Sequence, residues 1–172
     1  ATLILPADTA WNEASSGATV PLVPDSAKVS SEALDECARV LRTGEPVMLL
    51  LGNKGLRSEA LELAGRIAKK TGAVLHSESS AARTERGAGR VGVSRIPYVV
   101  DQALQVTRPF KHLILAGAKA PVAFFAYPGK PSHLMPEDCK IHQLVGPGHN
   151  IEDGLRQLAE AVGALNCEAD RQ

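Results

Sequence analysis

Two glycine-rich turns carry the residues of this chain whose types and spacing suit the binding of a diphosphate. The first turn follows the apolar run 47–51, and the second follows the apolar run 113–116. Backbone N–H groups in such a turn, and at the N-terminus of a helix that follows it, bind phosphate oxygens, and two lysines add positive charge. The candidate cofactor-binding residues, for a nucleotide cleft that would hold FAD or ADP, are Gly52, Asn53, Lys54, Gly55, Gly117, Ala118 and Lys119.

A purely structural explanation of the same turns is also open. A tight strand-to-helix connection needs backbone dihedral angles that glycine adopts most readily. The turn at 52–55 matches neither Gly-x-x-x-x-Gly-Lys-Ser/Thr nor Gly-x-Gly-x-x-Gly. The sequence therefore leaves nucleotide binding and a tight turn as alternatives.

Other reactive side chains form no complete constellation. Ser77, Ser79 and Ser80 follow a strand-like run, but no Gly-x-Ser-x-Gly surrounds them. Four residues with metal-binding side chains have spacings that fit no standard zinc site, and surface histidines with a small buried thiol explain them better. These four are His133, Cys139, His142 and His149. We therefore assign neither a metal site nor a catalytic residue to this chain.

The arginines in and just after the loop 77–93 have two explanations as well. They could bind an anion, or they could keep a mobile loop solvated; they are Arg83, Arg86, Arg90 and Arg95. The whole chain balances 19 basic against 19 acidic residues, which favours the second explanation and argues against nucleic acid as a partner.

The cysteine count and the hydropathy pattern bear on the compartment. Cys37, Cys139 and Cys167 are odd in number and widely separated, unlike the disulfide framework of a small secreted domain. No apolar run reaches the ~18 to 20 residues that cross a bilayer. The expectation is a soluble, cytoplasmic protein without a membrane partner.

The elements that must position the turns alternate between strand and helix. Strands are expected at 47–51, 73–76, 113–117, 122–126 and 140–145, with helices before, between and after them. Ser30 or Ser31 and Asn150 are candidate helix N-caps, and Gly72 is a candidate helix end. This alternation predicts an α/β fold with three layers, α/β/α, around a mostly parallel six-stranded sheet of Rossmann-like, FAD/NAD-binding-like topology.

The composition also predicts a domain organisation. Residues 1–8 contain a short strand-like run with no neighbouring partner, as expected of the end of a preceding domain. Residues 9–28 are rich in Ser, Gly, Pro and Ala, which is typical of a linker. Residues 29–165 would form the central α/β domain, and residues 166–172 a frayed tail.

Several phrases of the sequence resemble one known family. They are residues 3–8 with the linker, the Val-Met-Leu-Leu-Leu-Gly turn, Glu-Leu-Ala-Gly-Arg-Ile-Ala-Lys-Lys-Thr-Gly-Ala-Val at 62–74, Leu-Ile-Leu-Ala-Gly-Ala-Lys at 113–119 and Ala-Pro-Val-Ala-Phe-Phe-Ala-Tyr-Pro-Gly-Lys-Pro-Ser at 120–132. Together they resemble the central domain of thiamine diphosphate-dependent enzymes. The nearest likeness is to acetolactate synthase large-subunit-like proteins, with benzoylformate decarboxylase as a close relative.

The resemblance implies a non-catalytic role for this chain. Enzymes of the family have three α/β domains; the first, pyrimidine-binding domain holds one end of the cofactor, the third holds its diphosphate and Mg²⁺, and the middle one holds neither. The family's diphosphate motif begins Gly-Asp-Gly, and here only Glu152-Asp153-Gly154 comes close, inside an expected helix. The activating glutamate would precede residue 1. The fragment alone is then expected to be inactive.

The resemblance also supplies an expected parent. That parent would be an oligomeric transferase or lyase that decarboxylates a 2-oxo acid with thiamine diphosphate and Mg²⁺, and its flanking catalytic domains would be the partners of this chain. Some middle domains of the family bind FAD or ADP, and others have lost that site. The alternatives are a stand-alone FAD-, ADP- or NAD-binding module, such as a flavoprotein subunit, and a purely structural subunit interface.

Overall fold

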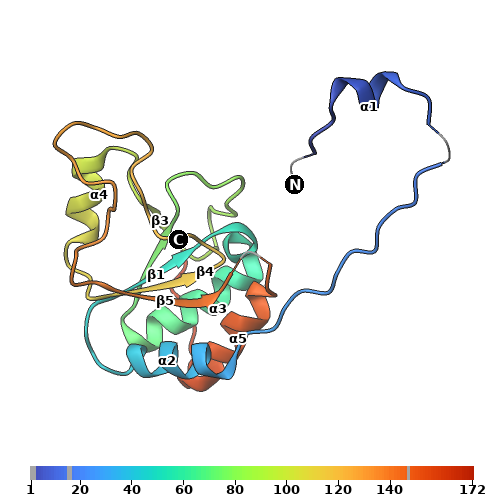
Figure 1. Ribbon diagram of the computed structural model, residues 1–172. Coiled ribbons are helices and arrows are strands. Elements are labelled where there is room, and N and C mark those ends of the chain that lie inside the picture. Colours follow the sequence, from blue (N-terminus) through green and yellow to red (C-terminus); the bar gives the residue numbers. More distant parts are fainter. Residues whose placement is uncertain (1–2, 15–16, 147) are drawn as a thin grey trace.

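A computed structural model shows an α/β body with an extended N-terminal arm (Figure 1). The structure describes residues 3–14, 17–146 and 148–172. The elements, in chain order, are α1 (Ala7–Trp11), α2 (Ser31–Leu41), β1 (Val47–Leu51), the 3₁₀ turn η1 (Asn53–Leu56), α3 (Ser58–Thr71), β2 (Val74–Ser77), β3 (Ser94–Arg95), α4 (Val100–Thr107), β4 (His112–Ala116), β5 (Lys140–Val145) and α5 (Ile151–Ala161).

The described strands form one parallel sheet in the order β3-β2-β1-β4-β5. Val47 of β1 pairs with His112 of β4, and Met48 pairs with Val74 of β2. The chain runs outward from β1 in both directions, so the point where the strand order reverses lies between β1 and β4. The α/β fold with a mostly parallel sheet is confirmed, with five described strands instead of the expected six.

Apolar side chains on both faces of the sheet explain the unbroken hydrophobic strands. Leu49 and Leu51 belong to the core beneath α2, α3 and α5, whereas Met48 and Leu50 belong to the core beneath α4. All five residues of β1 and of β4 are buried. A strand covered on both faces needs no polar alternation, which is why these runs read as continuous.

Local signals fix the helix ends as the sequence indicates. The Ser30 hydroxyl accepts a hydrogen bond from the Ala33 N–H, and the Asn150 side chain accepts one from the Asp153 N–H. Gly72 has φ of +79° and ends α3 in the left-handed conformation. No described helix has the length and apolarity that crossing a membrane requires.

The expected strand at 122–126 is wrong. Only Val122 pairs, through an isolated antiparallel bridge with His133, and the phenylalanines that follow are exposed. The apolar run has high strand propensity, but within the described structure it has no neighbouring strand to pair with. The short edge strand β3, which no sequence pattern predicted, pairs with β2.

The two ends of the chain also differ from expectation. Residues 3–5 form no strand, and residues 1 and 2 of the expected strand remnant lie outside the described part of the chain. At the other end the tail is held, because Ala169 is buried and Gln172 exchanges backbone hydrogen bonds with residues 89 and 90. This long-range pairing holds part of the segment 166–172, which was expected to fray.

Candidate functional site

The two glycine turns meet at the carboxyl ends of β1 and β4, where the strand order reverses. The Asn53 side-chain amide donates a hydrogen bond to the Gly117 carbonyl at 2.7 Å, and the Gly52 N–H donates to Ala116 at 3.1 Å. Open parallel sheets bind ligands at this kind of place. The structure thus brings the two groups of sequence-predicted residues together.

The turns approach each other too closely for larger residues. A Cβ atom on Gly52 would lie 2.6 Å from the Gly117 carbonyl oxygen and 2.9 Å from Ala118 Cα. Gly117 itself has φ of +70°, and Asn53 has φ of +50°. The glycines are therefore required by this close approach, whether or not the place also binds a ligand.

Glu78, which the sequence analysis did not consider, lies at the same place. One of its carboxylate oxygens accepts the Lys119 N–H at 2.9 Å, and the other is 2.6 Å from the position of a Cβ on Gly52. The residue directly follows β2, so its position after a strand was the available signal. This carboxylate takes a backbone donor that a phosphate oxygen would otherwise use, and its charge opposes an anionic ligand.

A groove of about 570 Å³ adjoins the turns and is lined by the starts of α3 and α5 together with Lys54 and Arg57. At the start of α3, a carboxylate of the protein itself already accepts the hydrogen bonds that a ligand would need. Glu85 accepts both the backbone N–H, at 3.0 Å, and the hydroxyl of Ser58. These hydrogen bonds, with the charges of Arg90 and Arg57, hold the pKa of Glu85 below its usual value. The loop 77–93 is thus held against the start of α3 by the Glu85 carboxylate.

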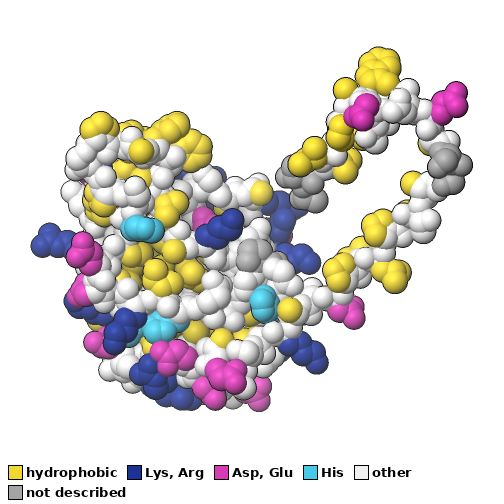
Figure 2. All heavy atoms as spheres, viewed as in Figure 1, with side chains coloured by type: hydrophobic (Ala, Val, Ile, Leu, Met, Phe, Trp, Pro, Cys, Tyr) yellow, Lys and Arg dark blue, Asp and Glu magenta, His cyan; other side chains and the backbone are white. Residues whose placement is uncertain are grey.

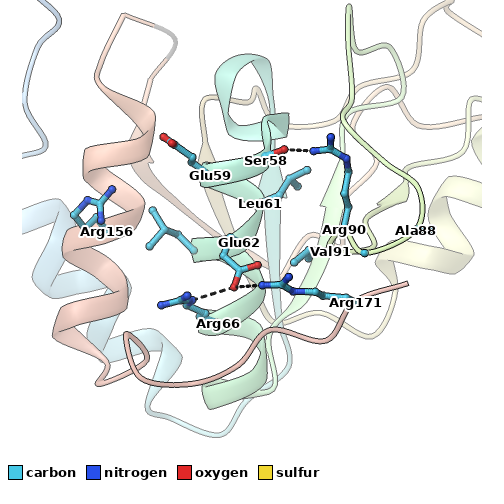
Figure 3. A pocket seen from close by; sticks show the side chains of 12 residues that line it. Ser58, Glu59, Leu61, Glu62, Arg66, Ala88, Arg90, Val91, Arg156 and Arg171 are labelled. Carbon is cyan, nitrogen blue, oxygen red and sulfur yellow. Dashed lines mark hydrogen bonds and ion pairs between the residues drawn. The ribbon is translucent and has the colours of Figure 1, made fainter.

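A second hollow, of about 610 Å³, lies between α3, residues 88–91 and the C-terminal tail (Figure 3). The Glu62 carboxylate lies between Arg66 and Arg171, at 3.2 and 3.1 Å. Arg90 donates to the Ser58 hydroxyl across the top of the hollow. Each of these three arginines is therefore paired with groups of the protein itself.

This hollow borders the one Gly-x-Gly-x-x-Gly in the sequence, residues 87–92, which the sequence analysis passed over. In a dinucleotide site the motif joins a strand to a helix. Here it follows irregular chain, and the Gly89 N–H donates to the Gln172 carbonyl at 2.7 Å. The motif therefore serves to pair with the tail in this structure.

The histidines and cysteines considered for zinc are not brought together. Within the described residues, no three His, Cys, Asp or Glu side chains are placed to hold a metal ion. His149 accepts the Gly146 N–H at 3.2 Å, and His142 instead contacts His112. Burial lowers the pKa of His142, while the Glu36 carboxylate opposes that shift. His112 was not singled out from the sequence, and its strand position gave no signal of this contact.

Comparison with known proteins gives a similar sequence and several similar structures. No family model matches the sequence. A Mycobacterium tuberculosis (strain ATCC 25618 / H37Rv) protein described as "Putative acetolactate synthase large subunit IlvX" is 43% identical over 162 residues, which are 94% of this chain and 31% of that protein. The chain thus spans about a third of the relative's length.

One of the structural matches is with a Mycobacterium smegmatis protein described as "a putative thiamin diphosphate-dependent enzyme". It has a TM-score of 0.64 and 19% identity, and it covers 92% of this chain and 33% of that protein. At this identity the match shows the fold. The resemblance to acetolactate synthase large-subunit-like proteins, drawn above from sequence phrases, is confirmed by the sequence comparison, and the α/β fold that it implies is confirmed by the structural one.

Proposed function

We propose that this chain is the central, non-catalytic domain of a longer thiamine diphosphate-dependent, acetolactate synthase-like enzyme. The observation that carries the proposal is the pair of coverages, since 94% of the chain matches only 31% of the relative. The structural match divides in the same way, with 92% of the chain against 33% of the solved protein. A single domain of a multidomain enzyme gives this relationship.

The residues of the chain do not fit thiamine diphosphate. Asp153, the nearest counterpart of the family's diphosphate motif, lies in the first turn of α5 and accepts a hydrogen bond from Gln157 at 2.8 Å. Gly154 packs against Val145, because a Cβ added to Gly154 would lie 2.6 Å from a Val145 methyl group. A helical segment packed against the sheet cannot wrap a metal-bound diphosphate. We therefore derive no catalytic step for this chain.

The proposed role is to link and orient the catalytic domains. The side chains of residues 17–26 are exposed, and the first backbone contact of the arm with the body is at Ala27, whose carbonyl accepts the Asn150 N–H at 3.0 Å. This supports residues 9–28 as a linker and 29–165 as the central domain, and residues 1–8 would be the end of a preceding domain. The intact enzyme would be an oligomeric, cytoplasmic protein with Mg²⁺ that decarboxylates a 2-oxo acid and transfers the hydroxyalkyl group.

The test compares the 172-residue chain with the protein encoded by the uninterrupted gene. Both are incubated with pyruvate, thiamine diphosphate and Mg²⁺, and the loss of pyruvate is measured. We expect turnover by the longer protein, and neither turnover nor a thermal shift with thiamine diphosphate for the 172-residue chain. A saturable shift or pyruvate consumption by the 172-residue chain overturns the proposal.

The alternative, a stand-alone FAD-, ADP- or NAD-binding module, is not favoured by the comparisons. Its test is direct. A purified chain with flavin absorbance, or with a saturable thermal shift by one of these nucleotides, would support the module.

A further inference from the structure

The aromatic residues of this chain contribute little to its core. The sequence contains three Phe, two Tyr and one Trp, six in 172 residues. Phe110 alone among them is buried. Large aromatic side chains usually fill cores or interfaces, because their apolar area is costly to leave in water. Exposed aromatic residues in this number indicate a surface that contacts another protein or domain.

Four of the six aromatic residues form one exposed cluster, which we call the aromatic patch. Its members are Tyr98, Phe124, Phe125 and Tyr127. The ring centroids lie 5.8 Å apart from Tyr98 to Phe124, 4.7 Å from Phe124 to Phe125 and 6.1 Å from Phe125 to Tyr127. Phe124 is 70% exposed and Phe125 is 56% exposed. The rings therefore contact one another while their outer faces remain in water.

The loop that carries the patch is held in place from both sides. The Ala123 N–H donates to the Ser132 carbonyl at 2.8 Å, beside the bridge between residues 122 and 133. Thr107 of α4 donates its hydroxyl proton to the carbonyl of the buried Leu134, and Lys130 forms an ion pair with Asp101 of α4. A surface that is ordered before binding loses little conformational entropy on binding.

The patch lies on the thinner side of the sheet. Helices α2, α3 and α5 cover one face, whereas α4 and the loop after β4 cover the other. That loop and α4 lie together at the upper left of Figure 1, and hydrophobic side chains gather over them in Figure 2. The layer with the least helical cover therefore also carries the largest group of exposed aromatic rings.

We propose that the aromatic patch is the surface on which a flanking domain of the longer polypeptide packs. This inference rests on the proposed function, and its occupant follows from length: more than two thirds of the similar relative lies outside the matched segment. Aromatic side chains are enriched, and charged ones depleted, at the centre of protein interfaces. The charges at the patch edge, Lys130 and Asp101, already neutralise each other, so an apolar surface fits best.

The test follows backbone hydrogen exchange at residues 122–127 in the 172-residue chain and in the longer protein. We expect exchange at least about tenfold slower in the longer protein, because the docked domain covers the loop. Equal exchange in the two proteins overturns the proposal. Protection that rises with the concentration of the 172-residue chain, together with a dimer in light scattering, also overturns it, since the occupant is then a second copy.

A double variant provides the energetic test. Phe124→Ser with Phe125→Ser should leave the thermal midpoint of the 172-residue chain unchanged and lower that of the longer protein by roughly 5 °C or more. Val74→Ser, at a residue 45% exposed on β2, is the matched control and should shift both proteins alike. An equal effect of the double variant in both proteins contradicts the inference.

These readouts separate the inference from the proposed function. Protection of 122–127 without pyruvate turnover leaves the docking surface standing and removes the catalytic assignment. Pyruvate turnover without protection of 122–127 leaves the catalytic assignment standing and removes the docking surface. A gene that encodes only these 172 residues overturns both.

Discussion

The Nδ1 atom of His112 lies 3.0 Å from the Nε2 atom of His142, with the ring centroids 5.2 Å apart. The outer nitrogens face carboxylates: His112 Nε2 is 2.9 Å from Glu45, and His142 Nδ1 is 3.2 Å from Glu36. An ionised carboxylate only accepts hydrogen bonds, so each outer nitrogen carries a proton. The two imidazoles therefore form a connected pair between two acids.

Acid should destabilise the fold through this pair before it protonates the carboxylates. Burial, with the positive charges of His112, Arg39 and Lys140, keeps the pKa of His142 below its usual value despite the Glu36 carboxylate. Since the folded state resists protonation, this stability is present above about pH 6.5 and is lost as pH falls through the lower folded pKa. Urea unfolding from pH 8 to pH 5 measures the effect.

The matching variant is His142→Gln. We expect it to cost about 1–3 kcal/mol at pH 8, because it removes the contact with the buried His112, and to flatten the loss of stability between pH 6.5 and pH 5. His133→Gln, at an exposed position, should keep the slope of the unaltered chain. An unchanged slope in His142→Gln would show that the pair does not titrate as described.

The two glycine turns predict a large difference between two alanine substitutions. Gly44 and Gly117 have similar φ, +77° and +70°, but a Cβ on Gly44 meets open space. A Cβ on Gly117 would meet the Ile151 side chain and lie 2.8 Å from the Gly52 carbonyl oxygen. We expect Gly44→Ala to cost about 1 kcal/mol, and Gly117→Ala about 3 kcal/mol or more, in chemical denaturation. Equal losses of stability for the two variants would contradict the close approach of Gly117 to Gly52.

Glu78 provides a way to decide between the two explanations of the cleft. If the turns bind a diphosphate, Glu78→Gln should bind ADP about fivefold more tightly than the unaltered chain, since one opposing charge near the surface amounts to about 1 kcal/mol. Isothermal titration measures this, with the exposed Glu137→Gln as control. No binding by either protein would leave the tight turn as the explanation.

The three cysteines should differ in reactivity. Burial, with the charge of Glu36, raises the pKa of the Cys37 thiol to about 12. Burial also raises the pKa of Cys139, which is only half-buried. In native protein at pH 8 we expect Cys167 to react first with a disulfide reagent, Cys139 more slowly and Cys37 only after denaturation. Mass spectrometry of the labelled peptides checks the order, and early labelling of Cys37 would contradict its burial.

The fluorescence emission of Trp11 should not change when the α/β body unfolds. It is the single tryptophan and is 86% exposed on α1, a helix with no buried residue. We expect the emission of a water-exposed indole, strong quenching by iodide and no shift in urea while the circular dichroism signal is lost. A blue-shifted emission that moves to red on unfolding would show that the arm packs on the body.

The part of the fold that could be predicted is the part that depends on local pattern. The runs that became β1 and β4 are buried on both faces, and a continuous apolar run is the direct sequence record of that environment. Their turns meet because the carboxyl ends of parallel strands share one edge. The wrong strand at 122–126 has the same local pattern, but Phe124 and Phe125 have no strand beside them, which no local pattern reveals.

The missed features all depend on contacts between distant segments. Glu78 meets Lys119, Glu85 caps α3 at Ser58, and Gln172 pairs with residues 89 and 90. Each acid is ordinary in its own sequence neighbourhood. The position of Glu78 directly after β2 placed it at the edge of the sheet where the site lies, but only the folded arrangement shows that it meets Lys119.

The parallel sheet has a consequence for how quickly the chain reaches its native state. Val47 pairs with His112, 65 positions away, and none of the described pairings within the sheet is a hairpin between adjacent strands. Long stretches must be ordered before such contacts form, which slows folding and leaves apolar strand edges open to other chains meanwhile. Low temperature and dilute refolding should therefore raise the yield of native protein.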